Sequence, residues 1–264
     1  MSSTAIFRQQ NFRLGDATVP RLKREIINTL APTGVLRAGI NMANFLLVSG
    51  QQPDGTPTGL SPDLAQRIAD ELGVRCAFVL FEGPGQLANA VHQNMWDIGN
   101  IAVEPARAKT IDFTLPYAQI DANFMTRDDA DFTGNDAIDT AGVRIAAYNR
   151  SAYDLWLSEN LSAAEIVRSE SIEASHEMFF NGQTDVLASL KPKLLQELSA
   201  RDGYRIIEPP FTAIRQAVGI VKGKKAAVGF LNNLISDLIT TGFVSRSMQH
   251  HGVTGKLSLP ADTR

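Results

Sequence analysis

The chain has 264 residues, a length that suits one large domain or two modest ones. Its 25 Lys and Arg oppose 28 Asp and Glu, giving a net charge of −3, and the basic residues form no continuous stripe. We therefore expect no nucleic-acid partner. No run approaches the roughly 20 apolar residues that a bilayer-spanning helix requires, so we expect a protein that is not embedded in a membrane.

From the sequence as written, we expect that this protein is not exported by an ordinary signal peptide. Several basic residues stand among its first residues, and no apolar stretch long enough for a signal-peptide core occurs before Ile26. If Met1 is the true start, this predicts a cytoplasmic protein. The single cysteine, Cys76, has no second cysteine to pair with and is expected to be a small buried apolar residue.

The first third of the chain alternates helical and strand patterns. Apolar spacing predicts a helix over residues 17–30, ended by a Pro-Thr-Gly turn. Strands at 35–41, 74–80 and 97–103 then alternate with helices at 61–72 and 84–92. This β-α-β-α-β order predicts parallel strands with helices on their faces, which is an α/β fold.

A second α/β cycle follows two strand-like segments at 113–117 and 123–126 and a polar stretch at 128–139. Its strands are predicted at 143–147, 166–167, 184–188 and 204–207, and its helices at 151–157, 172–180 and 192–200. The chain then returns through a strand at 217–221 to final helices at 226–241 and 244–250.

This order predicts two α/β lobes joined by a hinge of two crossing segments. We assign residues 1–122 and 217–264 to the first lobe, including the helix at 17–30, and residues 123–216 to the second. Ligands in such lobes bind at the carboxyl ends of the strands. The ligand site is therefore expected in the cleft between the lobes.

Several segments resemble the type II periplasmic solute-binding proteins of the polar amino-acid class (family 3), which serve ABC transporters. These segments are 34–40 (GVLRAGI), 59–65 (GLSPDLA) and, most specifically, 105–117 (PARAKTIDFTLPY). Further matches at 142–147, 180–185 and 242–243 extend the resemblance over roughly residues 32–252. It implies a periplasmic receptor that binds a small carboxylate solute such as an amino acid, does no chemistry on it, and delivers it to a transporter permease.

The resemblance implies that Arg107 binds the α-carboxylate of the ligand, a role that suits the bidentate guanidinium group. A surface Arg paired with Glu104 or Asp112 is the alternative. Ser151 and Ala152 begin a predicted helix, where the family offers hydrogen-bond donors to the same carboxylate and where helix ends attract anions. Ser151 is equally consistent with an ordinary helix cap.

Other site residues are expected at the ends of the first and third strands. Asn41, Asn44 and Phe45 stand where the family contacts the variable end of its ligands, although Phe45 also suits a core. Gly99 and Asn100 are expected to present backbone groups to the ligand, since glycine permits close approach. Asn100 equally suits a turn.

The chain departs from the family pattern at two positions. Ala102 replaces a common hydroxyl residue, and Leu190 replaces the acid that usually holds the α-ammonium group. An ammonium group enclosed without a carboxylate is costly. The ligand therefore either lacks an α-amino group or pairs with Glu104; Lys191 could bind a second anionic group or be solvated.

No cofactor or metal site is predicted, because the four histidines lack metal-ligand spacing to cysteines or carboxylates. An enzyme on the same scaffold, resembling a dehydratase or lyase and using Glu104 as acid or base, is the alternative function. A cytoplasmic ligand sensor is a third.

Overall fold

The computed structural model describes residues 18–261. Its helices are α1 (Thr18–Leu30), α2 (Leu60–Leu72), α3 (Pro84–Asn89), α4 (Ala152–Asn160), α5 (Ile172–Phe180), α6 (Lys191–Leu198), α7 (Lys225–Thr240) and α8 (Phe243–His250), with short 3-10 turns η1 (Ala90–Gln93), η2 (Arg107–Lys109) and η3 (Asn135–Ala137). Its strands are β1 (Val35–Asn41), β2 (Gly50–Gln51), β3 (Pro57–Thr58), β4 (Arg75–Phe81), β5 (Ile98–Ala102), β6 (Ile111–Phe113), β7 (Ala118–Arg127), β8 (Arg144–Tyr148), β9 (Glu165–Ser169), β10 (Val186–Leu190) and β11 (Tyr204–Val221).

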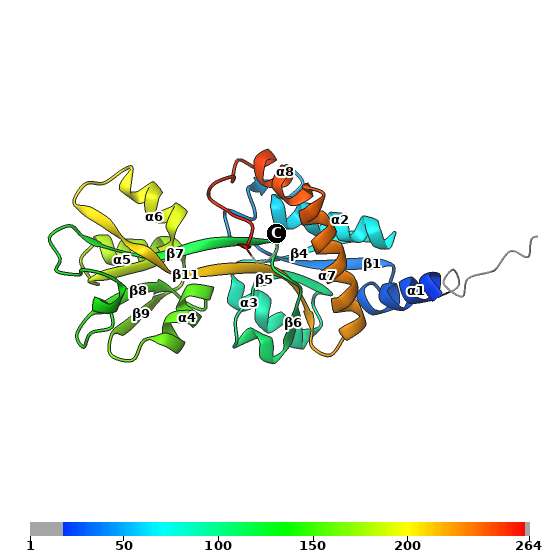
Figure 1. Cartoon of the computed structure of the whole chain (residues 1–264), viewed down its shortest axis with the longest axis horizontal. Helices are drawn as coiled ribbons and strands as arrows, with labels where there is room; N and C mark the ends of the chain where they lie inside the picture. The colour runs from blue at the N-terminus through cyan, green and yellow to red at the C-terminus, as the bar shows by residue number, and fades with distance from the viewer. Residues whose placement is uncertain (1–17, 262–264) are drawn as a thin grey trace, which may run out of the picture.

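The larger sheet has two parallel groups of strands joined by an antiparallel pair. In the described part of the chain its order is β4-β1-β5-β11-β7-β10-β8-β9, with β6 also paired to β11. β1 runs parallel to β4 and β5, and β8 runs parallel to β9 and β10. β7 and β11 are antiparallel to each other and to the neighbouring groups. The fold is thus two α/β lobes connected by two long strands (Figure 1).

The connecting strand β11 differs from the prediction. Two separate strands at 204–207 and 217–221 were expected, but the structure has one continuous strand, Tyr204–Val221. Its register against β7 shifts between Ile207 and Thr212. Pro209 and Pro210 fall in this interval and supply no N–H donor to the ladder, which explains why the sequence pattern breaks where the strand does not.

The predicted lobe boundaries, 122/123 and 216/217, fall inside β7 and β11. The division at these residues, and the action of the two strands as a hinge, remain predictions.

Amphipathic helices pack on each group of strands. α2 and α8 cover one face of the first lobe, and α3 lies on the other (Figure 1). Leu64, Ile68 and Leu72 on α2 are buried because they recur at helical spacing. In the second lobe, α5 and α6 enclose a core that includes Phe179, Leu187 and Leu194. These layers hold the strand ends that form the site.

Within the described residues, no single helix is long and apolar enough to cross a membrane. The helices α7 and α8 are long and apolar enough only when they are counted together, and the chain bends by 65° between them.

Candidate ligand-binding cleft

A small inner cavity of about 50 Å³ lies between the lobes. The first lobe and the connecting strand β11 provide part of its lining, and the second lobe provides the rest. Its lining residues are Asn41, Ala43, Asn44, Pro84, Ala102, Arg107, Tyr148, Ser151, Ala152, Tyr153, Ile172, Leu190, Ile214 and Gln216. The lining thus combines an apolar surface with one cation and no carboxylate.

Arg107 is a buried cation at this cavity, with only 5% of its surface exposed. Its Nη1 donates to the carbonyl of Ala102 at 3.0 Å, and its Nη2 donates to the carbonyl of Arg150 at 3.1 Å. The side chain therefore bridges the end of β5 and the loop before α4. Burial lowers the pKa of Arg107 to about 10, which leaves the guanidinium protonated at neutral pH.

The N-terminus of α4 lies at the same cavity. Ser151 caps the helix, and its hydroxyl accepts a hydrogen bond from the Asp154 N–H at 3.1 Å. Ala152 follows as the first helical residue, and both Ser151 and Ala152 line the cavity. The free N–H groups of a first helical turn favour an anion. Arg107 and α4 thus place a cation and a helix N-terminus at one cavity.

Asn41 and Asn44 line the inner cavity, as the end of β1 delivers them there. The Asn44 side-chain oxygen accepts from the N–H groups of Leu46 and Leu47, both at 3.3 Å, so it also caps a local turn. Phe45 does not line the inner cavity and is 38% exposed. It lies at a larger outer cavity instead.

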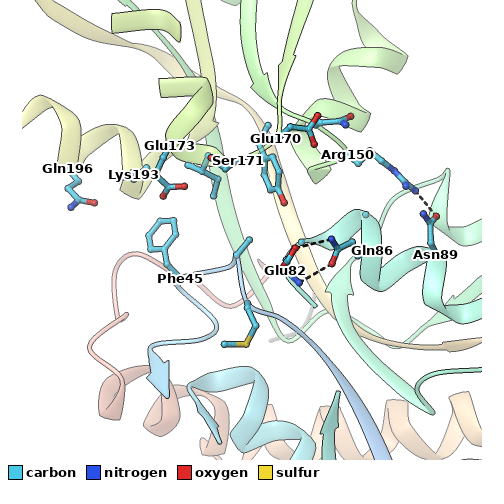
Figure 2. A pocket seen from close by; sticks show the side chains of 17 residues that line it. Phe45, Glu82, Gln86, Asn89, Arg150, Glu170, Ser171, Glu173, Lys193 and Gln196 are labelled. Atoms are coloured by element: carbon cyan, nitrogen blue, oxygen red, sulfur yellow. Dashed lines mark hydrogen bonds between the residues drawn. The ribbon is translucent and has the colours of Figure 1, made fainter. Parts of the chain in front are cut away.

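The outer cavity has a volume of about 960 Å³ and opens between the lobes. Figure 2 shows Phe45 and Glu82 from the first lobe on one side, with Glu170, Ser171 and Glu173 from the second lobe on the other. Ala43, Tyr148 and Ile172 line both cavities, so the two adjoin.

Three predicted residues lie outside the inner and outer linings: Gly99, Asn100 and Glu104. β5 continues to Ala102, so Gly99 and Asn100 remain inside the sheet, paired with β1 and β11. The Asn100 amide points to the Ser61 carbonyl at 3.5 Å. Glu104 is buried, and burial raises the pKa of its carboxyl to about 7 although Arg107 acts to lower it.

Ala102 and Leu190, where the family pattern is broken, both line the inner cavity. Lys191 follows Leu190 but forms an ion pair with Glu208 at 2.6 Å. Its charge is therefore already neutralised, and the structure does not bring it to the inner cavity.

Sequence reasoning missed several residues of the inner lining, chiefly Tyr148, Tyr153, Ile214 and Gln216. Tyr153 is 2% exposed, and its hydroxyl has no hydrogen-bond partner of good geometry although Ser151 and Ser189 lie beside it. The sequence offered one indication for two of these residues: Tyr148 and Tyr153 stand on either side of Ser151, which was itself predicted to bind the ligand.

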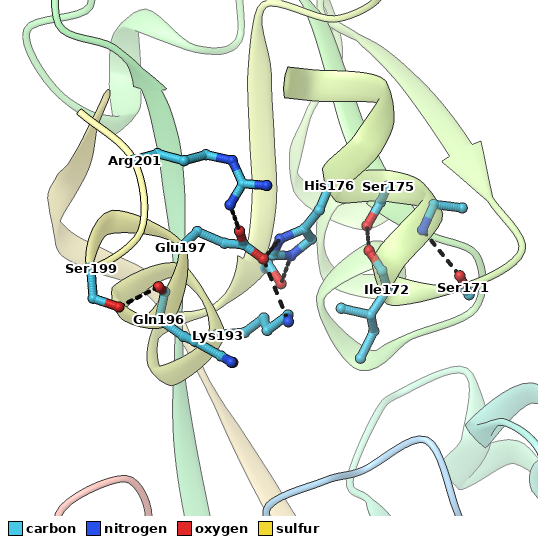
Figure 3. A network of polar contacts seen from close by, with 11 residues as sticks. Ser171, Ile172, Ser175, His176, Lys193, Gln196, Glu197, Ser199 and Arg201 are labelled. Carbon is cyan, nitrogen blue, oxygen red and sulfur yellow. Dashed lines mark hydrogen bonds and ion pairs between the residues drawn. The ribbon is translucent and has the colours of Figure 1, made fainter. Parts of the chain in front are cut away.

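The buried His176 belongs to a structural network of the second lobe (Figure 3). Its Nδ1 lies 3.1 Å from Glu197, and its Nε2 lies 3.0 Å from the Ser189 hydroxyl. Lys193 and Arg201 also pair with Glu197. Ser189 is fully buried and lines neither cavity, so this Ser-His-Glu arrangement has no access to a substrate. Among residues 18–261 no group of three or more His, Cys, Asp or Glu could hold a metal ion.

The sequence of this chain matches a known protein family. The model of the bacterial extracellular solute-binding proteins, family 3, matches residues 37–253. The chain belongs to this family. It is a solute-binding receptor, as the sequence resemblance predicted.

Named relatives bind amino acids. The chain is 26% identical to an L-arginine-binding protein of Pseudomonas aeruginosa over 81% of this chain and 86% of the relative. It is 21% identical to the L-cystine-binding protein TcyJ of Escherichia coli over 82% of each chain. The P235GK mutant of ArgBP from T. maritima has the same fold, with a TM-score of 0.69 and 18% identity, covering 85% of this chain and 98% of that one.

Proposed function

We propose that this receptor closes around a small organic carboxylate, with Arg107 of the first lobe and the α4 N-terminus of the second holding the carboxylate group. The proposal rests on the burial and the hydrogen-bond partners of Arg107. It is almost fully buried, yet within the described residues it forms no ion pair and donates only to two backbone carbonyls.

A buried guanidinium without a bound anion is energetically unfavourable. Its remaining N–H groups have no acceptor among the described residues, and arginine presents its donors in a planar fork that matches a carboxylate. A ligand carboxylate would supply both the charge and the acceptors. The N–H groups at the start of α4 would then bind the same group from the other side.

We further propose that the carboxylate has no α-amino group. The inner lining contains no Asp or Glu, and Leu190 occupies the end of β10. Glu104 lies outside the lining, so it offers no carboxylate to an ammonium group in the inner cavity, and burial raises the pKa of its carboxyl to about 7. The relatives bind L-arginine and L-cystine, and an enclosed α-ammonium group would be costly here.

Delivery to an ABC transporter permease is proposed from the family, in which the solute-binding protein is the receptor of the uptake system. Closure of the lobes would then present one surface to the permease only when ligand is bound.

The test is a thermal-shift screen of keto acids, hydroxy acids, dicarboxylates and amino acids. A ligand that binds only the folded protein should stabilise it by about 2.7 kcal/mol at a hundredfold excess over its Kd. Arg107→Ala should abolish this shift, and Arg107→Lys, which keeps the charge and loses the fork, should weaken it. Arg67→Ala, at an exposed ion pair on α2, is the matched control.

Recovery of the ligand unchanged after incubation would favour a receptor over an enzyme. If no carboxylate stabilises the protein, or if Arg107→Lys and Arg67→Ala bind equally well, the assignment of Arg107 is refuted.

A further inference from the structure

The outer cavity has an excess of negative charge. Glu82, Glu170 and Glu173 line it, and none forms an ion pair among the described residues. Glu82 has only a neutral partner, the Gln86 amide at 3.3 Å. Glu173 stands in the first turn of α5, where the helix dipole favours an acid, but Glu82 and Glu170 have no such explanation.

Two cations, Lys193 and Arg150, also line this cavity, and in the described part of the chain only Lys193 has a carboxylate partner. Lys193 pairs with Glu197 at 3.4 Å, and Glu197 also binds Arg201 and His176. The Arg150 guanidinium donates to the Asn89 side chain at 2.8 Å, across the cleft (Figure 2). The three glutamates therefore outnumber the two cations of the lining, and Arg150 is the cation there without a carboxylate partner among the described residues.

These carboxylates act on an aromatic residue that both cavities share. The pKa of Tyr148 is raised by burial and, to a smaller extent, by the charges of Glu170, Glu173 and Glu82. All three acids thus lie near its ring, and Phe45 faces the same opening. Aromatic rings and carboxylates together form an environment that favours an organic cation.

The inner cavity supplies an independent indication that one ligand occupies both spaces. The Tyr153 hydroxyl is buried at its wall, and it has no hydrogen bond of good geometry although Ser151 and Ser189 lie beside it. Buried polar groups in native proteins are normally satisfied. The Tyr153 hydroxyl would be satisfied by a polar ligand whose other end extends past Tyr148 into the outer cavity.

We propose that the ligand is a linear acid with its carboxylate in the inner cavity and a cationic amino or guanidino group at its far end among Glu82, Glu170 and Glu173. This rests on the proposed function and narrows it to ω-amino or ω-guanidino carboxylates that lack an α-amino group. The cleft presents groups in an order that matches such a ligand. The Arg107 cation lies in the inner cavity, an apolar wall follows, and the three glutamates lie in the outer cavity.

Four acids with one carbon skeleton test the two ends separately: pentanoate, 2-aminopentanoate, 5-aminopentanoate and 2,5-diaminopentanoate. Binding is measured by titration calorimetry at low salt. The 5-amino group should tighten binding about three- to tenfold, as expected for partly exposed ion pairs, and salt should reduce this gain. The 2-amino group should weaken binding, with or without the 5-amino group.

The double variant Glu82→Gln/Glu170→Gln should remove most of the gain from the 5-amino group and leave pentanoate affinity unchanged. Glu177→Gln, at an exposed position of α5 outside the cavity, is the matched control. Tyr153→Phe should weaken all four acids equally, since it acts at the inner end. ω-Amino acids of three to six carbons then report the length that the cleft accepts.

The outcomes separate the two proposals. Binding of pentanoate without any gain from the 5-amino group, or a gain that survives in the double variant, overturns this inference and leaves the carboxylate receptor intact. Tightest binding of 2,5-diaminopentanoate overturns the exclusion of α-amino groups. No binding of any acid overturns the carboxylate site itself.

Discussion

The buried carboxyl of Glu104 should make the stability of the protein depend on pH in a direction opposite to that of most acids. Its pKa rises from the ordinary 4.5 to about 7, chiefly through burial. Between these values the unfolded chain has lost the proton that the folded protein still holds, so the free energy of unfolding falls as pH rises. The neutral Glu104 carboxyl thus makes its full contribution to the free energy of unfolding below pH 4.5, and this contribution is lost above pH 7.

The size of this effect follows from the shift. At 1.36 kcal/mol per pKa unit, the difference between 4.5 and about 7 corresponds to about 3 kcal/mol. Solvent at the exposed edge of the side chain screens part of the penalty, so about 1–3 kcal/mol is expected. Arg107 does not contribute over this range, because its pKa of about 10 keeps it charged up to pH 8.

The measurement is urea unfolding of the wild type and of Glu104→Gln at pH 5 and pH 8. The loss of stability between these pH values should be larger in the wild type by about 1–3 kcal/mol. Other titrations cancel in the subtraction, including that of His176, whose pKa burial lowers and which acts in the opposite direction. Equal losses in the two proteins would show that Glu104 ionises normally, and the burial argument would be refuted.

Two further predictions concern single contacts. A methyl group at Gly83 would lie 2.2 Å from the Tyr148 hydroxyl oxygen and 3.4 Å from its Cζ. Gly83→Ala should therefore destabilise the contact between α3 and β8 by about 1–3 kcal/mol. It should also enlarge the radius of gyration measured by small-angle X-ray scattering. Adding Tyr148→Phe should restore both values, and failure of this rescue would contradict the steric reason. Burial raises the pKa of Cys76 to about 11, so iodoacetamide should label the native protein at pH 7.5 far more slowly than the urea-unfolded chain; similar rates would contradict this.

Local patterns in the sequence predicted most of the fold. The helix predicted at 172–180 is confirmed as α5, and the strand at 35–41 is confirmed as β1, because both begin and end at residues whose spacing and caps are local. The continuous β11 was missed, since its pairing with β7 across the two prolines depends on strands distant in sequence.

The candidate site was predictable only where it follows the ends of strands. Asn41, Asn44, Ser151 and Ala152 reach the inner cavity because they stand at or after the ends of β1 and β8. Gly99 and Asn100 lie inside β5, which extends to Ala102, and they line neither cavity. Gln216 and Ile214 belong to the interior of β11, so only the pairing of the two lobes brings them to the cavity.

The contacts of Arg150 connect the two lobes and bear on the free energy of opening the cleft. Arg150 adopts a left-handed backbone with φ of 58°, unusual for a residue other than glycine and costing about 1 kcal/mol or more. Asp154 accepts from its N–H at 2.7 Å, while its carbonyl accepts from Arg107 and its guanidinium binds Asn89. Two of these contacts connect the second lobe to the first through single hydrogen bonds from a guanidinium group, each worth about 1.5–3 kcal/mol net. Because the inner cavity is small and these two bonds contribute only a few kcal/mol, a ligand that adds a charged contact at Arg107 would shift the balance between open and closed states.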